Sequence, residues 1–318
     1  MMVKLPDMIM ADGFPVSLVF SKSGRVFFSE RVTGNLWEVL GEEKYRLVKH
    51  FSVVPVTGHH ETGLLGIALD PDFESNDLIY CFYTTGADID HCENKVVCID
   101  TQGLDKHTVI DKLPAARTHD GGIIAFGSDG KLYIGLGVQN EIMAKSQDLK
   151  HLGGKVLRIN TDGSIPSDNP FSGSPVYTYG HRNLFGFAVQ QETGKMFVSE
   201  AGPDRDDEIN ILEAGGNYGW PEVTGVAINK KYIDPIITFT PTITPTQCAF
   251  YKSNFYFGSY NEGTVHQLTF AEDQKTIKSD KIVYRGKSFG VIGVFVSPSG
   301  EFFVSTPNRI LRIDTPGT

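Results

Sequence analysis

The stretch "IAFGSDGKLYIGLG", residues 124–137, decides the fold class. Two apolar runs flank the tight turn "SDGK", and this arrangement predicts a β-hairpin. The first residues of successive copies of the pattern lie 46 to 63 residues apart, a period typical of propellers and solenoids. The other five copies are "VFSKSGRVFFSE" (19–30), "IALDPDFESNDLIYCFYT" (67–84), "FAVQQETGKMFVSE" (187–200), "CAFYKSNFYFGS" (248–259) and "VFVSPSGEFFVST" (294–306).

Several hairpins are followed by a further β-rich run, which predicts a third strand, as in "NLWEVL" (35–40) and "GKVLRIN" (154–160). Helical periodicity is nearly absent, and "EIMAKSQDLKHLGG" (141–154) is the one stretch that could form a helical turn. We therefore expect an all-β fold, a six-bladed β-propeller of four-stranded antiparallel blades, in a single domain over residues 1–318. Two packed β-sandwiches would not explain the even recurrence as well.

Composition narrows the classes of partner. The 318 residues carry a formal net charge of -9, which argues against nucleic acid or an anionic membrane as a partner. We find no apolar run near the ~18 residues of a membrane span, and residues 1–14 lack the apolar core of a signal peptide. The four cysteines are too few for a disulfide scaffold. A bridge from Cys92 to Cys81 or Cys98 stays open at this point.

Five segments carry a family resemblance when they are taken together. As a set they resemble the soluble quinoprotein sugar dehydrogenases, the family of glucose/sorbosone and aldose sugar dehydrogenases. The resemblance implies a propeller that uses pyrroloquinoline quinone (PQQ) and calcium to oxidise a small aldose sugar, with an external electron acceptor. We expect an exported monomer or homodimer. The segments are "GHHETGLLGIALDPDF" (58–73), "THDGGIIAFGSDGKLYIGLG" (118–137), "SQDLKHLGGKVLRINTDGSIPSDNPF" (146–171), "VYTYGHRNLFGFAV" (176–189) and "SEAGPDRDDEINILEAGGNYGWP" (199–221).

The resemblance implies a catalytic role for His119 and Arg182. His119 matches the base that takes the proton of the sugar hydroxyl while hydride passes to the quinone, a task that suits the pKa of imidazole. Arg182 matches an arginine that stabilises negative charge on the quinone, and Asn183 matches its polar neighbour at the cofactor. Glu61 stands where the family places Gln or Glu near the substrate.

The resemblance also implies calcium ligands. Gly202 and Pro203 match positions whose carbonyls hold the calcium that polarises PQQ, and hard oxygen ligands suit this ion. Glu208 and the backbone of Tyr218 match ligands of a second, structural calcium. Trp220, beside the cofactor, and Tyr218, beside the substrate, would line the same face.

Several positions depart from the family pattern. Val138 replaces the aspartate that orients the histidine, and Ala201 replaces a polar residue beside the calcium carbonyls. Two further hypotheses therefore stand beside the dehydrogenase: a propeller that keeps calcium but has lost PQQ binding and binds a sugar or a protein, and a calcium-dependent lactonase. The expected cations for the PQQ carboxylates are replaced by Ile123, Asn261, Thr264, Gly290 and Ile292.

Overall fold

The computed structural model describes residues 6–55, 60–228, 231–286 and 290–316. The hairpin predicted from residues 124–137 forms as expected, from β10 (Ile123–Phe126) and β11 (Leu132–Leu136). Ile124 pairs with Ile134 across the two strands. In the turn, the Asp129 carboxylate accepts a hydrogen bond from the Lys131 backbone, and Gly130 adopts a φ of 70°, which glycine tolerates without strain.

Four sheets have four antiparallel strands each. The first contains β2 (Pro15–Phe20), β3 (Val26–Glu30), β4 (Asn35–Gly41) and β5 (Lys44–His50). The second contains β6 (Leu64–Leu69), β7 (Leu78–Asp88), β8 (His91–Asp100) and β9 (Asp105–Leu113). The third adds β12 (Lys155–Ile159) and β13 (Val176–Tyr179) to β10 and β11. The fourth contains β14 (Leu184–Val189), β15 (Met196–Glu200), β16 (Asp207–Ile211) and β17 (Ile237–Phe239).

The remaining strands form one eight-stranded sheet, so the prediction of six four-stranded blades is wrong. Its two halves join because β18 and β22 pair in parallel at Gln247 and Gly293. A Cβ on Gly293 would lie 3.0 Å from the Gln247 Cβ, so glycine allows this approach. In order, the sheet contains β1 (Met8–Met10), β24 (Arg309–Ile313), β23 (Phe302–Thr306), β22 (Gly293–Val296), β18 (Pro245–Tyr251), β19 (Asn254–Ser259), β20 (Thr264–Phe270) and β21 (Ile277–Arg285).

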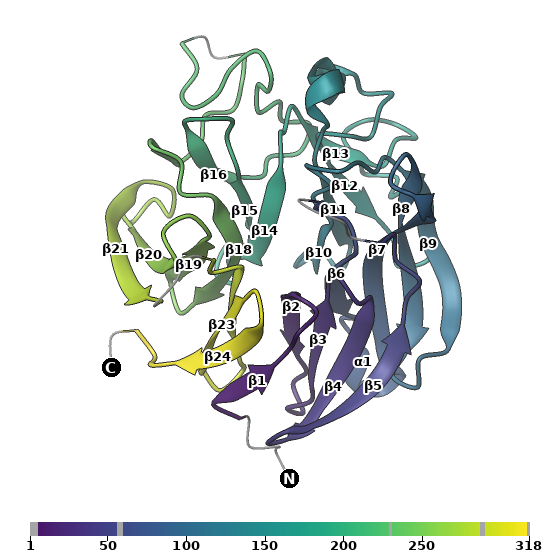
Figure 1. The fold of residues 1–318 in the computed structure, drawn as a ribbon. Helices are drawn as coiled ribbons and strands as arrows, with labels where there is room; N and C mark the ends of the chain where they lie inside the picture. The colour runs from purple at the N-terminus through teal and green to yellow at the C-terminus, as the bar shows by residue number, and fades with distance from the viewer. Residues whose placement is uncertain (1–5, 56–59, 229–230, 287–289, 317–318) are drawn as a thin grey trace.

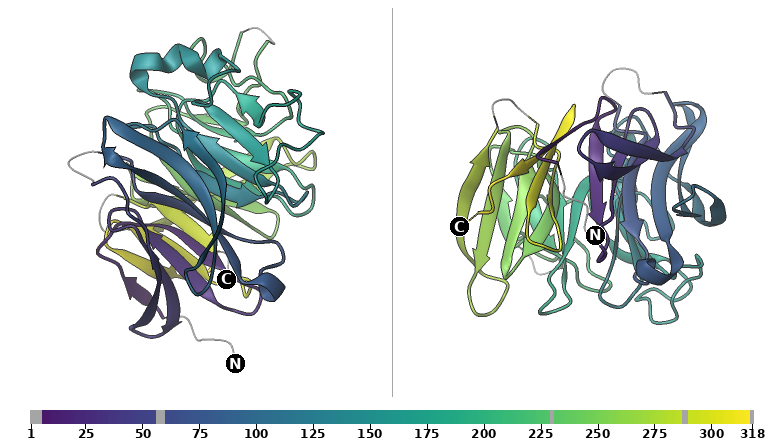
Figure 2. Two further views of the ribbon diagram at one scale, coloured as in Figure 1. Left: turned by 90° about the vertical axis from the view of Figure 1, so that its right-hand side faces the viewer. Right: turned by 90° about the horizontal axis from the view of Figure 1, so that it is seen from below.

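The first strands of the repeats surround a common axis (Figure 1). Strands β2, β6, β10, β14, β18 and β22 contact one another in a closed ring. Figure 2 shows the sheets packed face to face around this axis. The N-terminal strand β1 pairs with the C-terminal strand β24, with Met8 opposite Leu311, and so joins the two ends of the chain. The result is an all-β propeller with its strand edges protected by closure.

The core lies between neighbouring sheets, which explains why the inner strands are apolar on both faces. Every residue of β11 is buried. Leu132 and Ile134 pack toward Tyr80 of the preceding sheet, whereas Tyr133 packs toward Phe187 of the following sheet. Successive side chains of a strand point to opposite faces, so such a strand reads as a continuous apolar run.

Helical structure is limited to α1 (Phe73–Asn76) and the 3-10 helix η1 (Asn140–Gln147), which overlaps the helical turn expected over 141–154. All four cysteines are free, so the open question of a Cys92 bridge is answered against a disulfide. Within the described ranges, the structure contains no helix long and apolar enough to cross a membrane.

Candidate functional site

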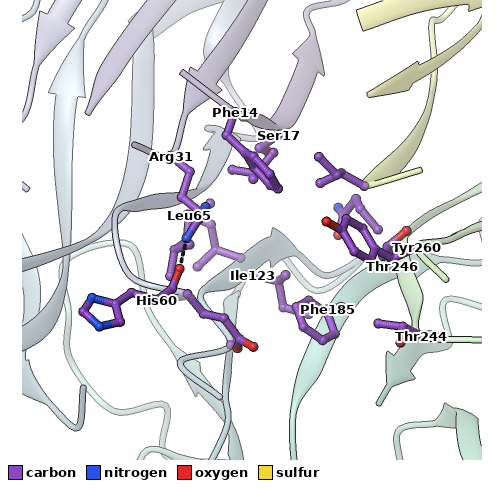
Figure 3. A pocket seen from close by; sticks show the side chains of 17 residues that line it. Phe14, Ser17, Arg31, His60, Leu65, Ile123, Phe185, Thr244, Thr246 and Tyr260 are labelled. Carbon is purple, nitrogen blue, oxygen red and sulfur yellow. Dashed lines mark hydrogen bonds between the residues drawn. The ribbon is translucent and has the colours of Figure 1, made fainter. Parts of the chain in front are cut away.

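A cavity of about 440 Å³ lies at the axis, which we call the axial pocket. Its walls come from β2, β6, β10, β14 and β18 and from the loops between sheets (Figure 3). Its volume falls in the range of roughly 300–1,000 Å³ that is typical of small-molecule sites. The apolar side chains of its wall include Phe14, Val16, Leu65, Ile123, Phe185 and Ile292.

Arg31, which directly follows β3, is the one lysine or arginine among the described residues that line this pocket. Its Nη1 donates to the carbonyl oxygens of His60 and Thr62, and its guanidinium carbon lies 4.6 Å from the centre of the Phe14 ring. The Nε of Arg31 is buried and has no hydrogen-bond partner. Burial lowers the pKa of Arg31. The pocket therefore holds one largely desolvated cation.

Glu61 connects the axial pocket to two other predicted site residues. It lines the pocket, and its Oε2 accepts hydrogen bonds from the His119 backbone N at 2.7 Å and from the Asn183 Nδ2 at 3.2 Å. The Oδ1 of Asn183 is buried without a partner. These contacts bring residues more than 50 positions apart in the sequence into one cluster. Such a cluster is expected for a site built from the loops of several sheets.

His119 is held by backbone rather than by a carboxylate. Its Nδ1 lies 3.0 Å from the carbonyl oxygen of Val138, the position where the family pattern has an aspartate. Its Nε2 makes no hydrogen bond within the described chain. Burial, followed by the positive charge of Arg182, lowers the pKa of His119. The residue has a φ of 62°, a left-handed conformation in which histidine is one of the better tolerated side chains.

Arg182 lies against the segment that follows β15. Its Nη1 donates to the Ala201 carbonyl at 2.9 Å, and its guanidinium carbon lies 5.5 Å from the centre of the Trp220 ring. Its backbone N donates to the Glu200 carboxylate. Burial lowers the pKa of Arg182, and its Nε is buried without a partner. The cation is thus fixed in place beside Trp220, with one donor left free.

The predicted calcium residues gather in a small second pocket. Gly202, Pro203, Glu208, Tyr218 and Trp220 all line it, together with Arg182 and Glu200. The Gly202 backbone N donates to the Asp207 carboxylate at 2.7 Å, which fixes the turn after β15. The structure therefore brings together on this side the residues that the resemblance assigned to calcium.

Glu208 is a buried carboxylate without a basic partner in the described chain. Its oxygens accept hydrogen bonds from the Asn210 Nδ2 and the Gly225 backbone N. Burial, reinforced by the negative charge of Glu200, raises the pKa of Glu208 to about 8. The Oδ1 of Asn210 is buried without a partner. A buried carboxylate without an ion-pair partner suits calcium, although no group of three or more His, Cys, Asp or Glu side chains among the described residues is arranged to hold a metal.

Of the predicted site residues, only Glu61 lines the axial pocket, whereas His119 lines a separate small pocket beside Val138 and the others lie elsewhere. Tyr218 and Trp220 are both held by contacts away from the axial pocket. The Tyr218 hydroxyl donates to the Ile211 carbonyl at 2.6 Å, and its ring stacks on His181. The Trp220 carbonyl accepts hydrogen bonds from Ser146 and Gln147, and its Nε1 is buried without a partner. Neither residue lines the axial pocket, so the predicted substrate contact of Tyr218 has no support from this placement.

The axial pocket does not match a tricarboxylate such as PQQ. Ile123 and Ile292 line it at positions where the family pattern has cations. Asn261 instead donates to the Thr242 carbonyl at 3.2 Å. Arg31 and Glu61 contribute one positive and one negative charge to the wall, so three buried carboxylates would be left largely unpaired, at several kcal/mol for each unpaired ion.

Sequence reasoning missed most polar residues of the axial pocket, among them Arg31, His60, Gln247 and Tyr260. Arg31 carried the one usable signal, since a basic residue directly after an apolar strand of a propeller stands at the end where ligands bind. Gln247 sits inside β18 and gave no signal in the sequence. Figure 3 shows Arg31 and Tyr260 on different sides of the cavity.

The fold is a β-propeller with a cavity at its axis, and polar residues cluster beside this cavity. Comparison with protein families places the chain further: residues 13–312 match the family described as Glucose / Sorbosone dehydrogenase. The protein belongs to this family of quinoprotein sugar oxidoreductases, and the resemblance read from the sequence is confirmed.

Individual relatives agree with the family. Quinoprotein glucose dehydrogenase B of Acinetobacter calcoaceticus is 33% identical over 252 residues, a match that covers 69% of this chain and 52% of that protein. The chain therefore spans about half the length of this relative.

Solved structures agree as well. A putative oxidoreductase (glucose dehydrogenase) from Thermus thermophilus superposes with a TM-score of 0.86 at 31% identity, covering 96% of this chain and 98% of that one. The PQQ-bound aldose sugar dehydrogenase from Streptomyces coelicolor superposes with a TM-score of 0.82 at 28% identity, covering 96% and 97%.

Proposed function

We propose that this protein is an oxidoreductase that oxidises a CH–OH group of a sugar, with His119 as the base. The observation that carries the proposal is the contact of 3.0 Å between the His119 Nδ1 and the Val138 carbonyl. A carbonyl oxygen can only accept, so Nδ1 holds the proton of the neutral ring and Nε2 keeps its lone pair. Backbone thus performs the orienting task that a carboxylate performs elsewhere.

The reaction transfers two electrons and two protons in all. Nε2 of His119 accepts the hydroxyl proton while hydride leaves the same carbon for an electron acceptor in the neighbouring axial pocket. Burial and Arg182 favour the neutral imidazole, so the base form is available near pH 7. Arg182 is a fixed cation that stabilises negative charge as it grows on the acceptor. The Oε1 of Glu61, which makes no hydrogen bond within the described chain, is free to orient a substrate hydroxyl.

An activity measurement tests this proposal. The purified protein is supplied with a panel of aldoses and a redox dye, with and without quinones, and dye reduction is followed. His119→Asn keeps a residue that tolerates the left-handed conformation but removes the base, and should lower turnover by roughly 10²-fold or more. His107→Gln, at an exposed position of β9, is the matched control and should keep full activity. Equal turnover by His119→Asn and wild type would contradict the proposal.

Calcium is the cation that the second pocket fits. Glu208 would provide the carboxylate ligand, and the carbonyls of Gly202, Pro203 and Tyr218 would provide neutral oxygens. When bound, calcium would neutralise the buried carboxylates of this second pocket. The proposal is supported by the raised pKa of Glu208, because a carboxylate that is difficult to ionise alone gains from a bound cation.

Thermal unfolding tests the calcium proposal without any activity assay. Calcium should raise the Tm of the chelated wild-type protein, because a ligand that binds the native state stabilises it by mass action. Glu208→Gln should abolish this response, and Glu192→Gln, at an exposed position, should retain it. Identical melting curves for calcium-loaded and chelated wild type would count against the site.

A second function is favoured by the apolar wall of the axial pocket. Ile123 and Ile292 replace expected cations, which is consistent with a propeller that binds a sugar or protein without catalysis. Such a protein would show no dye reduction with any aldose, and its His119→Asn variant would bind the same ligands as wild type. The same activity assay therefore separates the two functions.

A further inference from the structure

The axial pocket contains polar groups that the reaction proposed above does not use. Gln247 and Tyr260 line it, and Arg31 brings one positive charge to its wall. A cation removed from water is unfavourable unless it is paired, so the charge of Arg31 favours a ligand that carries an anion. The ligand must offer an acceptor to Arg31.

We propose that the axial pocket binds a flat aromatic quinone with a single acidic group, and that its anion pairs with Arg31. The inference rests on the proposed function, since it names the class of electron acceptor in that reaction. The quinone takes the hydride from the sugar carbon, and the proton held by His119 completes the hydroquinone. The sugar is oxidised to the carbonyl compound, and both electrons and both protons are accounted for.

The shape and lining of the pocket favour an aromatic ligand. Phe14, Phe185 and Tyr260 contribute rings to the wall, and Ile123 and Ile292 contribute branched apolar surface. Figure 3 shows Phe14, Ile123, Phe185 and Tyr260 around one cavity. Aromatic and aliphatic walls of this kind bury a flat ring well and give nothing to a ligand with charge on several edges.

The charges of the wall limit the ligand to one anion. Arg31 supplies the single positive charge of the described lining, and Glu61 supplies a negative charge in the same wall. A second or third carboxylate would face either Glu61 or apolar side chains, and both placements disfavour an ion removed from water. The chain thus keeps the family fold while its pocket is matched to a ligand of lower charge.

Binding of two quinones with the same ring system tests the inference. The probes are 2-hydroxy-1,4-naphthoquinone, which is ionised at neutral pH, and its uncharged analogue 2-methoxy-1,4-naphthoquinone, with PQQ as the tricarboxylate. Isothermal titration calorimetry at pH 7.5 should show at least tenfold tighter binding of the anionic probe than of either other compound. Equal affinity of the two naphthoquinones, or tighter binding of PQQ than of the anionic probe, would overturn the proposal.

Variants assign the preference to Arg31. Arg31→Gln should reduce the ratio of the two naphthoquinone affinities to near one, whereas Arg31→Lys should restore much of it. Arg309→Gln, which removes an exposed arginine on β24, should leave the ratio unchanged. Ile292→Arg adds a cation to the wall and should improve PQQ binding more than binding of the anionic probe. Circular dichroism of each variant confirms folding, and an unchanged ratio in folded Arg31→Gln would refute the assignment.

Failure of this inference is distinguishable from failure of the proposed function. Binding is measured without sugar, so it does not depend on His119. If the anionic probe binds through Arg31 but no sugar is oxidised, the reaction is wrong and the ligand class stands. If sugars are oxidised with a dye while the naphthoquinones bind equally, the ligand class is wrong and the reaction stands.

Discussion

Replacing Asp120 with asparagine should make the protein more stable at alkaline pH. Asp120 directly follows His119 and is only 3% exposed. Its Oδ1 accepts a hydrogen bond from the Ala116 backbone N at 2.6 Å, and its Oδ2 lies 3.3 Å from the Thr84 Oγ1. The Thr84 hydroxyl donates its single proton at 2.7 Å to Asn94. A protonated Asp120 can therefore donate to Thr84, whereas an ionised Asp120 faces an occupied hydroxyl.

The magnitude follows from linkage between protonation and folding. Burial raises the pKa of Asp120 to about 7, against an unfolded value of about 3.9. A folded pKa above the unfolded one contributes stability that is fully present below pH ~4 and is lost as pH rises through about 7. The difference corresponds to roughly 4 kcal/mol in the free energy of unfolding. The amide introduced by Asp120→Asn would be neutral at every pH and could keep both hydrogen bonds.

Urea unfolding at several pH values measures this effect. Between pH 5 and pH 8, wild type should lose a few kcal/mol of unfolding free energy, and Asp120→Asn should lose markedly less. Asp90→Asn, at an exposed position on the neighbouring hairpin turn, is the control and should follow wild type. If Asp120→Asn is less stable than wild type at pH 8, the carboxylate is ionised and paired in the native state, and the reasoning fails.

Two further predictions concern stability elsewhere. Lys155→Met should destabilise the protein by several kcal/mol in urea unfolding, because the buried Nζ donates to the carbonyls of Lys145, Ser146 and Gly153, and each would lose its partner. A loss below ~1 kcal/mol would show that the carbonyls find other donors. For His266, burial lowers the pKa, but Asp280 and Glu262 outweigh it, so the pKa is raised overall. Its stabilisation is present below pH ~6.5 and lost as pH rises through the higher folded value, so His266→Gln should flatten the unfolding free energy between pH 6 and pH 8. An unchanged slope would contradict the charge pairing.

Much of the fold was readable because it depends on local patterns. The turn at Gly130 and the apolar runs on either side of it specify a hairpin within about a dozen residues. The pairing between hairpins of separate repeats cannot be predicted in this way. The eight-stranded sheet forms through the parallel pairing of Gln247 with Gly293, and these residues belong to separate repeats. No local pattern reports the distance between them.

Site residues could be predicted from the sequence where they belong to a motif. They were missed where their role depends on their position in the folded structure. His119, Arg182 and Glu208 could be identified because their side chains match a motif. Arg31 could not be identified, because its role depends on the cavity in front of it rather than on its neighbours in sequence. Gln247 lies within a strand that reads as core, and its free Oε1 becomes visible only with the walls assembled around it.

Residue 138 can orient His119 although it lacks the carboxylate of the family pattern. Read as sequence, valine in place of aspartate removes the group that orients the histidine. In the structure, the carbonyl of the same residue lies 3.0 Å from the His119 Nδ1. The carbonyl selects the same tautomer as a carboxylate would, but it carries no charge and cannot stabilise an imidazolium. His119 should therefore be a weaker base than one paired with aspartate, and the low pKa that burial and Arg182 impose points the same way. At residue 138 the hydrogen-bond acceptor for His119 is retained but its charge is lost. The wall of the axial pocket has likewise lost charged side chains, at Ile123 and Ile292.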